Sequence, residues 1–352
     1  MPARSIRTLA RLAWSVLLAW PLLSASATPG GAAADGVGDW ARGDKAELRL
    51  VSATGSIAPG QEAVRLGLHV RLEEGWKIYW RSPGSAGLPP EVAWEGSDNL
   101  AAARLLWPSP KRFELFGLQS FGYAGEVVLP IEARLAAPGE PAALRARVTY
   151  LVCREICIPG EALLSLDLAA GPGAPSDAAH LISRFAGRVP APAHAAAITL
   201  TAEQAAHGLV VTARSPLPLA APDLFVETDG LLDLPAPAVT LSEGGLLARF
   251  QFPRASLPAG TVATLTLVDG PLAVESRATV TAASQGIGAI LPIALLGGLL
   301  LNLMPCVLPV LAMKMAGLAA LAGKGRAVVR LKLAATGAGV VGSMLLLGIS
   351  TH

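Results

Sequence analysis

The sequence VRLGLHVRL at residues 64–72 alternates between apolar side chains and other residues. Valine and leucine occupy the even positions, while arginine, glycine and histidine occupy the odd ones. A period of two places all the apolar side chains on one face of an extended chain. This stretch therefore predicts a half-buried β-strand, with the odd positions facing solvent.

Strand patterns continue through most of residues 28–286, and short Pro- and Gly-containing turns separate them. Around residues 171–196 the composition changes to Gly, Pro and Ala, and Ser176-Asp177 predicts the start of one short helix that runs to about Gly187. We therefore predict two β-sandwich domains joined by a linker that contains this helix. The domains are expected at residues 28–170 and 197–284, and the further predicted strands are 127–129, 148–150, 164–168, 198–201, 209–212, 247–252, 262–268 and 273–281.

The amino terminus, residues 1–27, has the features of a secretory signal peptide. Arg4, Arg7 and Arg11 precede the apolar residues 12–23, and an Ala-Ser-Ala cleavage pattern ends the segment. The apolar stretch is too short to cross a hydrocarbon core of about 30 Å, which argues against a membrane anchor. The mature chain is therefore expected outside the cytoplasm.

Two uncharged stretches near the carboxyl end, residues 287–313 and 333–350, predict α-helical transmembrane segments. The loop between them, residues 314–332, carries five basic residues and no acidic one. Positively charged loops stay in the cytoplasm, so residues 28–286 are expected in the periplasm of a bacterial inner-membrane protein. Because the sequence stops two residues after the second stretch, we expect a longer parent protein.

The charge distribution excludes one class of partner. The whole chain has a formal net charge of +2, with 28 basic and 26 acidic residues. All the acidic residues lie in the predicted periplasmic part, which is therefore mildly acidic and has no basic stripe. This distribution argues against nucleic-acid binding. The hydrophobic fraction of 52% is high for a soluble protein and agrees with membrane segments.

Two cysteines, Cys153 and Cys157, lie close together in the sequence YLVCREICIPG at residues 150–160. Four extended residues span about 13 Å, whereas a disulfide needs Cα atoms within roughly 7 Å, so pairing requires a backbone bend between the cysteines. Pro159-Gly160 predicts a turn just after them. A loop this short gives little entropic stabilisation, which favours an exchangeable disulfide over a structural one. An inert structural disulfide and a metal site stay open, although no further ligand is spaced for metal around the pair.

The third cysteine, Cys306, lies in the sequence MPCVLP at residues 304–309, within the first predicted membrane segment. Pro305 and Pro309 bracket the thiol and would kink the helix, and neighbouring protein or water must then satisfy the freed carbonyl groups. Asn302 adds an amide, which is costly in lipid unless it faces protein or a wet cavity. This environment suits a thiol that reacts with a partner, and the alternative is a small buried hydrophobe.

Several of these motifs resemble the DsbD family of thiol:disulfide interchange proteins, and most closely its ScsB-like branch. The sequence GGLLLNLMPCVLP at residues 297–309 resembles the first transmembrane helix of that family. The stretches at 75–84 (GWKIYWRSPG), 88–90 (LPP) and 150–159 resemble its N-terminal periplasmic domain. The resemblance covers about residues 40–170 and 287–350 and leaves residues 197–284 unmatched.

The resemblance implies an electron relay from cytoplasmic thioredoxin, through a cysteine pair in the membrane, to oxidised periplasmic client proteins. It implies that Cys153 and Cys157 are the redox pair of an immunoglobulin-like domain and that Cys306 is the first of two membrane cysteines. In such a domain a cap loop shields the disulfide with an aromatic residue, and Phe116 in the sequence FELFG is the candidate. Thiol–disulfide exchange needs no bound cofactor.

The chain also departs from the family pattern. Three residues separate Cys153 from Cys157, whereas the best-known members have five, and the second membrane cysteine and the thioredoxin-like domain are absent. The chain is therefore not expected to complete the relay alone. An alternative of another class is a membrane-tethered periplasmic binding module with a structural disulfide, which aromatic residues expected to be exposed near 76–80 would favour. Scattered histidines and methionines give no support to copper binding.

Overall fold

The computed structural model describes residues 36–283, except Phe116 and Leu231, and a few residues between 292 and 339. The chain divides into two compact units, 1–282 and 283–352, and the fold described below belongs to the first. The predicted signal peptide, Cys306 and most of both predicted membrane segments lie outside the described residues. Among the residues that are described, no helix has the length and apolar character needed to cross a membrane.

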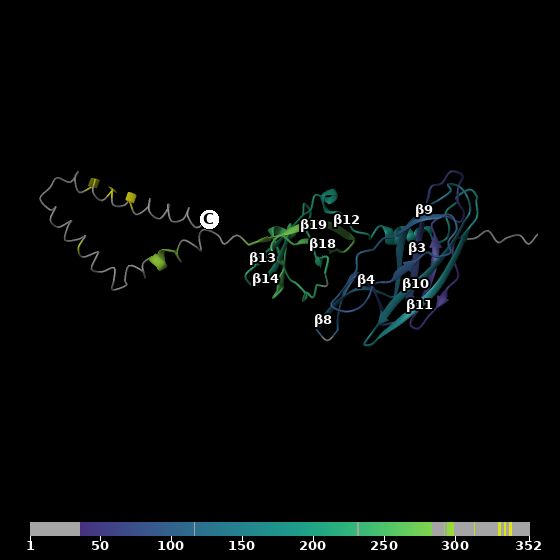
Figure 1. Cartoon of the computed structure of the whole chain (residues 1–352), viewed down its shortest axis with the longest axis horizontal. Coiled ribbons are helices and arrows are strands. Elements are labelled where there is room, and N and C mark those ends of the chain that lie inside the picture. Colours follow the sequence, from purple (N-terminus) through teal and green to yellow (C-terminus); the bar gives the residue numbers. More distant parts are fainter. Residues whose placement is uncertain are drawn as a thin grey trace, which may run out of the picture. The chain divides into compact units, whose positions relative to one another are not determined.

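The first β domain, residues 41–168, contains two antiparallel sheets (Figure 1). The first sheet has the strand order β1-β2-β3-β9-β6. Its strands are β1 (Ala41–Arg42), β2 (Ala46–Ser52), β3 (Ala63–Leu72), β6 (Leu100–Leu105) and β9 (Glu126–Leu135). Each pairing in this sheet is antiparallel, as in a sandwich made of hairpins and meanders.

The second sheet has the order β11-β10-β4-β8-β7, and β5 also pairs with β10. Its strands are β4 (Lys77–Gly84), β5 (Glu91–Ala93), β7 (Lys111–Leu115), β8 (Leu118–Ala124), β10 (Ala142–Cys153) and β11 (Cys157–Leu168). The longest pairing joins β10 to β11, from Ala142 opposite Leu168 to Cys153 opposite Cys157. This hairpin forms the redox-site end of the sheet.

The core of the first β domain follows from alternating side chains on both sheets. Leu144, Val148 and Val152 of β10 are buried, while residues at the alternate positions, such as Arg147 and Thr149, are partly or fully exposed. These residues share one hydrophobic core with Leu66 and the other apolar residues of β3. The prediction of a mostly β protein is therefore confirmed.

The structure corrects the prediction that the odd positions of residues 64–72 face solvent at two of these positions, while Arg65 and Arg71 are exposed as predicted. Gly67 and His69 of β3 are buried, because the second face of this strand is also covered. Helix α1 (Ala179–Ala186) contacts β3 and β9, and a Cβ on Gly67 would press against Val128 and against Ile182 of this helix. Glycine is therefore required here for close helix packing.

The aromatic residues near 76–80 are also placed differently from the prediction. Trp76, Tyr79 and Trp80 are all buried rather than exposed. Strand β4 lies between β10 and β8 inside its sheet, so its aromatic side chains pack in the core. The exposed aromatic surface that would have favoured a binding module is therefore absent at these positions.

Helix α1 lies in the segment between the two β domains. It begins at Ala179, and Gly187 forms its carboxyl-terminal cap. Ser176 is the polar residue at its start, since its Oγ accepts a hydrogen bond from the backbone N–H of Ala178 and donates to the carbonyl of Ser52. These bonds tie the beginning of the helix to the end of β2.

The second β domain, residues 191–282, forms a continuous ladder in the order β15-β18-β19-β13-β14-β17-β16, with β12 also paired to β19. Most pairings are antiparallel, but β12 and β13 both run parallel to β19. The domain has its own core, which includes Phe250 and Phe252. Its elements are β12 (Ala191–Pro192), η1 (Ala193–Ala196), β13 (Thr199–Ala205), β14 (Gly208–Arg214), β15 (Asp223–Glu227), β16 (Ala238–Ser242), η2 (Glu243–Gly245), β17 (Leu247–Pro253), β18 (Val262–Asp269) and β19 (Leu272–Ala282).

Candidate redox site

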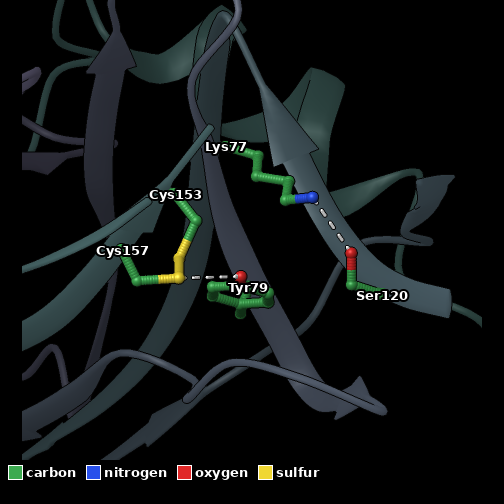
Figure 2. The surroundings of a disulfide bond; sticks show 5 residues. All are labelled: Lys77, Tyr79, Ser120, Cys153 and Cys157. Carbon is green, nitrogen blue, oxygen red and sulfur yellow. Dashed lines mark hydrogen bonds between the residues drawn. A yellow bond between two sulfur atoms is a disulfide. The ribbon is translucent and has the colours of Figure 1, made fainter. Parts of the chain in front are cut away.

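Cys153 and Cys157 form a disulfide at the turn end of the β10–β11 hairpin (Figure 2). Their Cα atoms are 4.1 Å apart. The three residues between them, 154–156, make the bend that pairing requires, and the N–H of Arg154 donates to the carbonyl of Ile156 at 3.0 Å. The two cysteines are thus the last register pair of the hairpin.

The turn predicted at Pro159-Gly160 is not present. Both residues lie inside β11, where Pro159 is opposite Leu151 and Gly160 is opposite Tyr150. Strand β11 is at the edge of its sheet, and proline is tolerated there because an edge strand does not need every N–H for pairing. A Cβ on Gly160 would overlap the ring of Tyr150, so this glycine lets the ring lie against the hairpin.

The two sulfur-bearing residues differ in exposure. Cys153 is only 2% exposed, whereas Cys157 is exposed to solvent. Next to it, Ile156 is 66% exposed, so this end of the hairpin presents an apolar side chain beside the accessible cysteine. Thiol–disulfide exchange requires access to the attacked or attacking sulfur. Cys157 is therefore open to a partner in thiol–disulfide exchange, whereas Cys153 is shielded from solvent.

Tyr79 of β4 lies beside the accessible sulfur. Its hydroxyl oxygen is 3.7 Å from the Sγ of Cys157 (Figure 2). Burial raises the pKa of Tyr79, so the phenol remains protonated and can act as a hydrogen-bond donor. Gly87 packs directly on the ring, where any Cβ would overlap it, and its φ of 110° is one that L side chains rarely adopt. The segment around Gly87 thus holds the ring in place.

Lys77 lies on the other side of the disulfide, as the register partner of Cys153. Its Nζ donates to the Oγ of Ser120 at 3.1 Å and lies 5.2 Å from the ring centre of Phe113 (Figure 2). Burial lowers the pKa of Lys77. The amino group is directed toward Ser120 and Phe113, so its hydrogen bond joins β4 to β8 beside the disulfide (Figure 2).

The segment predicted as a cap loop is the tip of a β-hairpin. Strands β7 and β8 pair up to Leu115 opposite Leu118, and Gly117 between them has a φ of 79°, which favours glycine. The candidate Phe116 is outside the described residues. Phe113, three residues earlier, is the hairpin aromatic that contacts Lys77.

Sequence reasoning identified both cysteines but not their polar neighbours. Lys77 and Tyr79 belong to the quoted motif at 75–84, and their spacing of two places them on one face of a strand. That spacing was the available signal. Ser120 had no such signal, because its partner lies 43 residues earlier. Among the described residues, no three His, Cys, Asp or Glu side chains gather as metal ligands would.

Comparison with known families relates this region to the motifs noted above. Residues 48–169 match the family model described as "Thiol:disulfide interchange protein DsbD, N-terminal". The N-terminal region is DsbD-like. The resemblance predicted from the sequence is thereby confirmed for the DsbD-like part. Residues 188–283 match a domain of unknown function. No match was found among curated proteins.

Solved structures support the same fold for the described region. The N-terminal periplasmic domain of ScsB from Proteus mirabilis matches with a TM-score of 0.57 and 22% identity, over 70% of this chain and 98% of that one. The reduced DsbD N-terminal domain of Neisseria meningitidis shares 19% identity over 36% of this chain and 86% of its own, with a TM-score of 0.21. Only the first similarity is strong enough to inform the fold, and it spans both β domains.

Proposed function

We propose that the chain is a membrane-anchored periplasmic protein-disulfide reductase, in which Cys157 attacks and Cys153 resolves. The observation that carries the proposal is a disulfide with one exposed and one buried cysteine at the end of a hairpin in a DsbD-like domain. An exposed sulfur can meet a client disulfide, while its buried neighbour is protected from other oxidants.

The reaction begins with both cysteines reduced. The thiolate of Cys157 attacks one sulfur of a client disulfide, and the other client sulfur leaves as a thiolate that takes up a proton. Cys153, after losing its proton, attacks the Sγ of Cys157 in the resulting mixed disulfide and releases the second client thiolate. The client gains two electrons, and the chain regains the Cys153–Cys157 disulfide.

The neighbours of the cysteines have separate roles in this scheme. Tyr79 donates a hydrogen bond to the Cys157 thiolate from its position 3.7 Å away in the oxidised state. Lys77, the register partner of Cys153, holds β4 to β8 through Ser120 and so positions the strand next to the resolving cysteine. Neither step requires a cofactor.

Regeneration of the reduced site belongs to the same proposal. Cys306, in the predicted first membrane segment, would deliver electrons that originate from thioredoxin in the cytoplasm. Residues 28–286 would then work in the periplasm of a bacterial inner-membrane protein. The Pro-Cys-x-x-Pro sequence at 305–309 and the basic loop that follows it support this arrangement.

A redox titration of the full chain tests the proposal. The chain is equilibrated in thiol–disulfide buffers, free thiols are trapped, and mass spectrometry follows the peptides that contain Cys153 and Cys157. We expect a midpoint between about −120 and −270 mV, the range of exchange catalysts. A midpoint below about −300 mV would identify a structural disulfide and favour the membrane-tethered binding module instead.

The roles of the two cysteines need a second experiment. A Cys153→Ser variant keeps the attacking cysteine and removes the resolving one, so mixed disulfides with periplasmic clients should accumulate in cells. The Cys157→Ser variant is the matched control and should accumulate far fewer. Equal trapping by the two variants would contradict the assigned roles.

A further inference from the structure

The second β domain contacts the same strands that build the redox site. Phe225 of β15 is only 1% exposed and belongs to the hydrophobic core of the first β domain. Its ring packs edge-on against Phe121 of β8 and Trp80 of β4, with centroid distances of 5.0 and 5.8 Å. One aromatic side chain of the second domain therefore joins two strands of the first.

Arg112 of β7 makes the most directional contact between the two domains. Its Nε and Nη2 donate to both carboxylate oxygens of Asp223, with distances of 3.0 Å from Nε to Oδ2 and 2.8 Å from Nη2 to Oδ1. The Nη2 also donates to the carbonyl of Leu224 at 2.8 Å. The guanidinium carbon lies 4.9 Å from the ring centre of Phe121 and 5.1 Å from that of Phe225. Bidentate pairing of this kind fixes orientation as well as distance.

Arg81 of β4 forms a second polar contact. It donates to Glu227 through Nε at 3.0 Å and through Nη2 at 2.6 Å, and its Nη2 also pairs with Glu275. The same guanidinium lies over the ring of Trp80 at 4.6 Å. The side chains of Arg81 and Glu227 are largely shielded from solvent, so salt screens this pair less than an exposed one.

The Arg112 contact lies one register step from two residues that contact Lys77, the neighbour of the disulfide. Arg112 is opposite Phe121 in the β7–β8 hairpin, and the next pair is Phe113 opposite Ser120. Phe113 and Ser120 are the two residues that contact Lys77, the register partner of Cys153. A displacement of the hairpin would therefore move the surroundings of the disulfide.

Strand β7 needs such support because it is the last strand of its sheet. A hairpin at a sheet edge opens locally at lower cost than a central strand, since it has hydrogen bonds on one side only. Contacts from the second domain reach β7 through Arg112 and β8 through Phe121. They restrain both strands at once.

We propose that the second β domain is a brace that positions β4 and the β7–β8 hairpin and thereby sets how fast the Cys153–Cys157 disulfide exchanges. Arg81, Arg112, Asp223, Phe225 and Glu227 are the brace residues, and they act as positioning residues. The inference deepens the proposed function and rests on it for its biological meaning. It assigns a role to the region that matches a domain of unknown function.

The test measures the rate constant for reduction of the disulfide by dithiothreitol in the full chain. Timed samples are alkylated, and the peptides with Cys153 and Cys157 are quantified by mass spectrometry. Arg112→Ala and Asp223→Ala should each accelerate reduction about fivefold or more, the lower end of typical coupling between sites. The double variant should match the faster single variant, because both changes remove the same contact.

Two matched controls remove exposed ion pairs elsewhere. Arg104→Ala breaks the pair with Glu132 in the first domain, and Arg214→Ala breaks the pair with Glu243 in the second. Both controls should reduce at the wild-type rate. Arg112→Lys keeps the charge but loses bidentate geometry, so it should fall between wild type and Arg112→Ala, and it provides a second variant if the alanine change prevents folding.

Amide hydrogen exchange of residues 111–124 separates positioning from general destabilisation. Faster exchange in this hairpin together with faster disulfide reduction supports the brace. Faster exchange with an unchanged reduction rate overturns it, as does wild-type behaviour in both measurements.

The midpoint potential of the disulfide distinguishes failure of the reductase proposal from failure of the brace proposal. A midpoint below about −300 mV refutes the reductase but not the brace, whereas a midpoint in the catalytic range with unchanged rates refutes only the brace.

Discussion

The hydroxyl oxygen of Tyr79 lies 3.7 Å from the Sγ of Cys157, although 78 residues separate them in the sequence. The phenol is held there by the backbone of Gly87 against its ring and by burial within β4. A donor in this position stabilises a thiolate more than a thiol. The contact therefore links the aromatic motif of β4 to the reactivity of the exposed cysteine.

Replacing Tyr79 by phenylalanine should raise the pKa of the Cys157 thiol in a Cys153→Ser background. A hydrogen bond contributes about 1 kcal/mol, so we expect a rise of about 0.7 pH units. The pH dependence of the iodoacetamide alkylation rate measures this pKa. Tyr150→Phe is the control, because it removes a hydroxyl from the same hairpin without touching the contact to Cys157. Equal pKa values in the Tyr79→Phe variant and its parent would show that the hydroxyl does not act on the thiolate.

Exposure predicts different reactivities for the two thiols. In single-cysteine variants, the Cys157 thiol should react with alkylating agents at least about tenfold faster than the Cys153 thiol, because only the former is open to solvent. Alkylation at neutral pH, quenched at a series of times, measures both rate constants. In denaturant the difference should disappear, and its persistence there would mean that burial is not its cause.

Gly87→Ala should destabilise the first β domain by about 1–3 kcal/mol. The added Cβ would overlap the ring of Tyr79, and the residue has a φ of 110°. Urea unfolding followed by tryptophan fluorescence measures the change. Gly96→Ala is a matched control, since Gly96 also has a positive φ but no atom within 4 Å of the added Cβ. If both variants lost the same stability, the ring contact would not contribute.

His69 should make the fold sensitive to mild acid. Its Nδ1 accepts from Arg49 at 3.2 Å, and its Nε2 lies 2.9 Å from the carboxylate of Glu126. Burial lowers the pKa of His69, although the bond to Glu126 opposes this effect. The unfolded chain therefore binds a proton more readily below about pH 6.5, and stability should fall as the pH decreases through this range.

A His69→Gln variant can preserve both hydrogen bonds without titrating, so it should lack the loss of stability between about pH 6.5 and 5. Glu126 does not interfere in this window, because its own pKa is lowered and its protonation matters only at more acidic pH. Thermal unfolding at a series of pH values compares the variant with wild type. If the stability of the variant and that of wild type changed equally with pH, His69 would not be the group that titrates.

Much of the first β domain could be predicted because its strands carry period-two patterns. Residues 64–72 fall entirely within β3, and residues 164–168 within β11. The pattern could not reveal that α1 covers the second face of β3, since this packing joins Gly67 to Ile182. The alternation identified the strand, whereas tertiary packing buried Gly67 and His69.

The candidate site, too, could be predicted from the sequence only in part. The short spacing of Cys153 and Cys157 indicated a bent, exchangeable pair, but it could not show which cysteine is exposed. The turn expected at Pro159-Gly160 was wrong because position at a sheet edge, which depends on the whole topology, decides whether proline fits a strand. The pairing of Arg112 with Asp223 had no local signal, since 111 residues separate them.

The hairpin that carries the disulfide has a consequence for repeated turnover. Strands β10 and β11 each contain 12 residues and stay paired from Ala142 and Leu168 to the two cysteines. The ladder already holds the cysteine backbones together, so the covalent bridge restricts only the three residues of the loop, and its loss removes little constraint from the unfolded chain. If the proposed function holds, the domain would accept and release electron pairs repeatedly on a scaffold held by the ladder rather than by the disulfide. A partner that reduces it and a partner that it reduces would then meet the same surface, in two states that differ only in the oxidation level of two sulfur atoms.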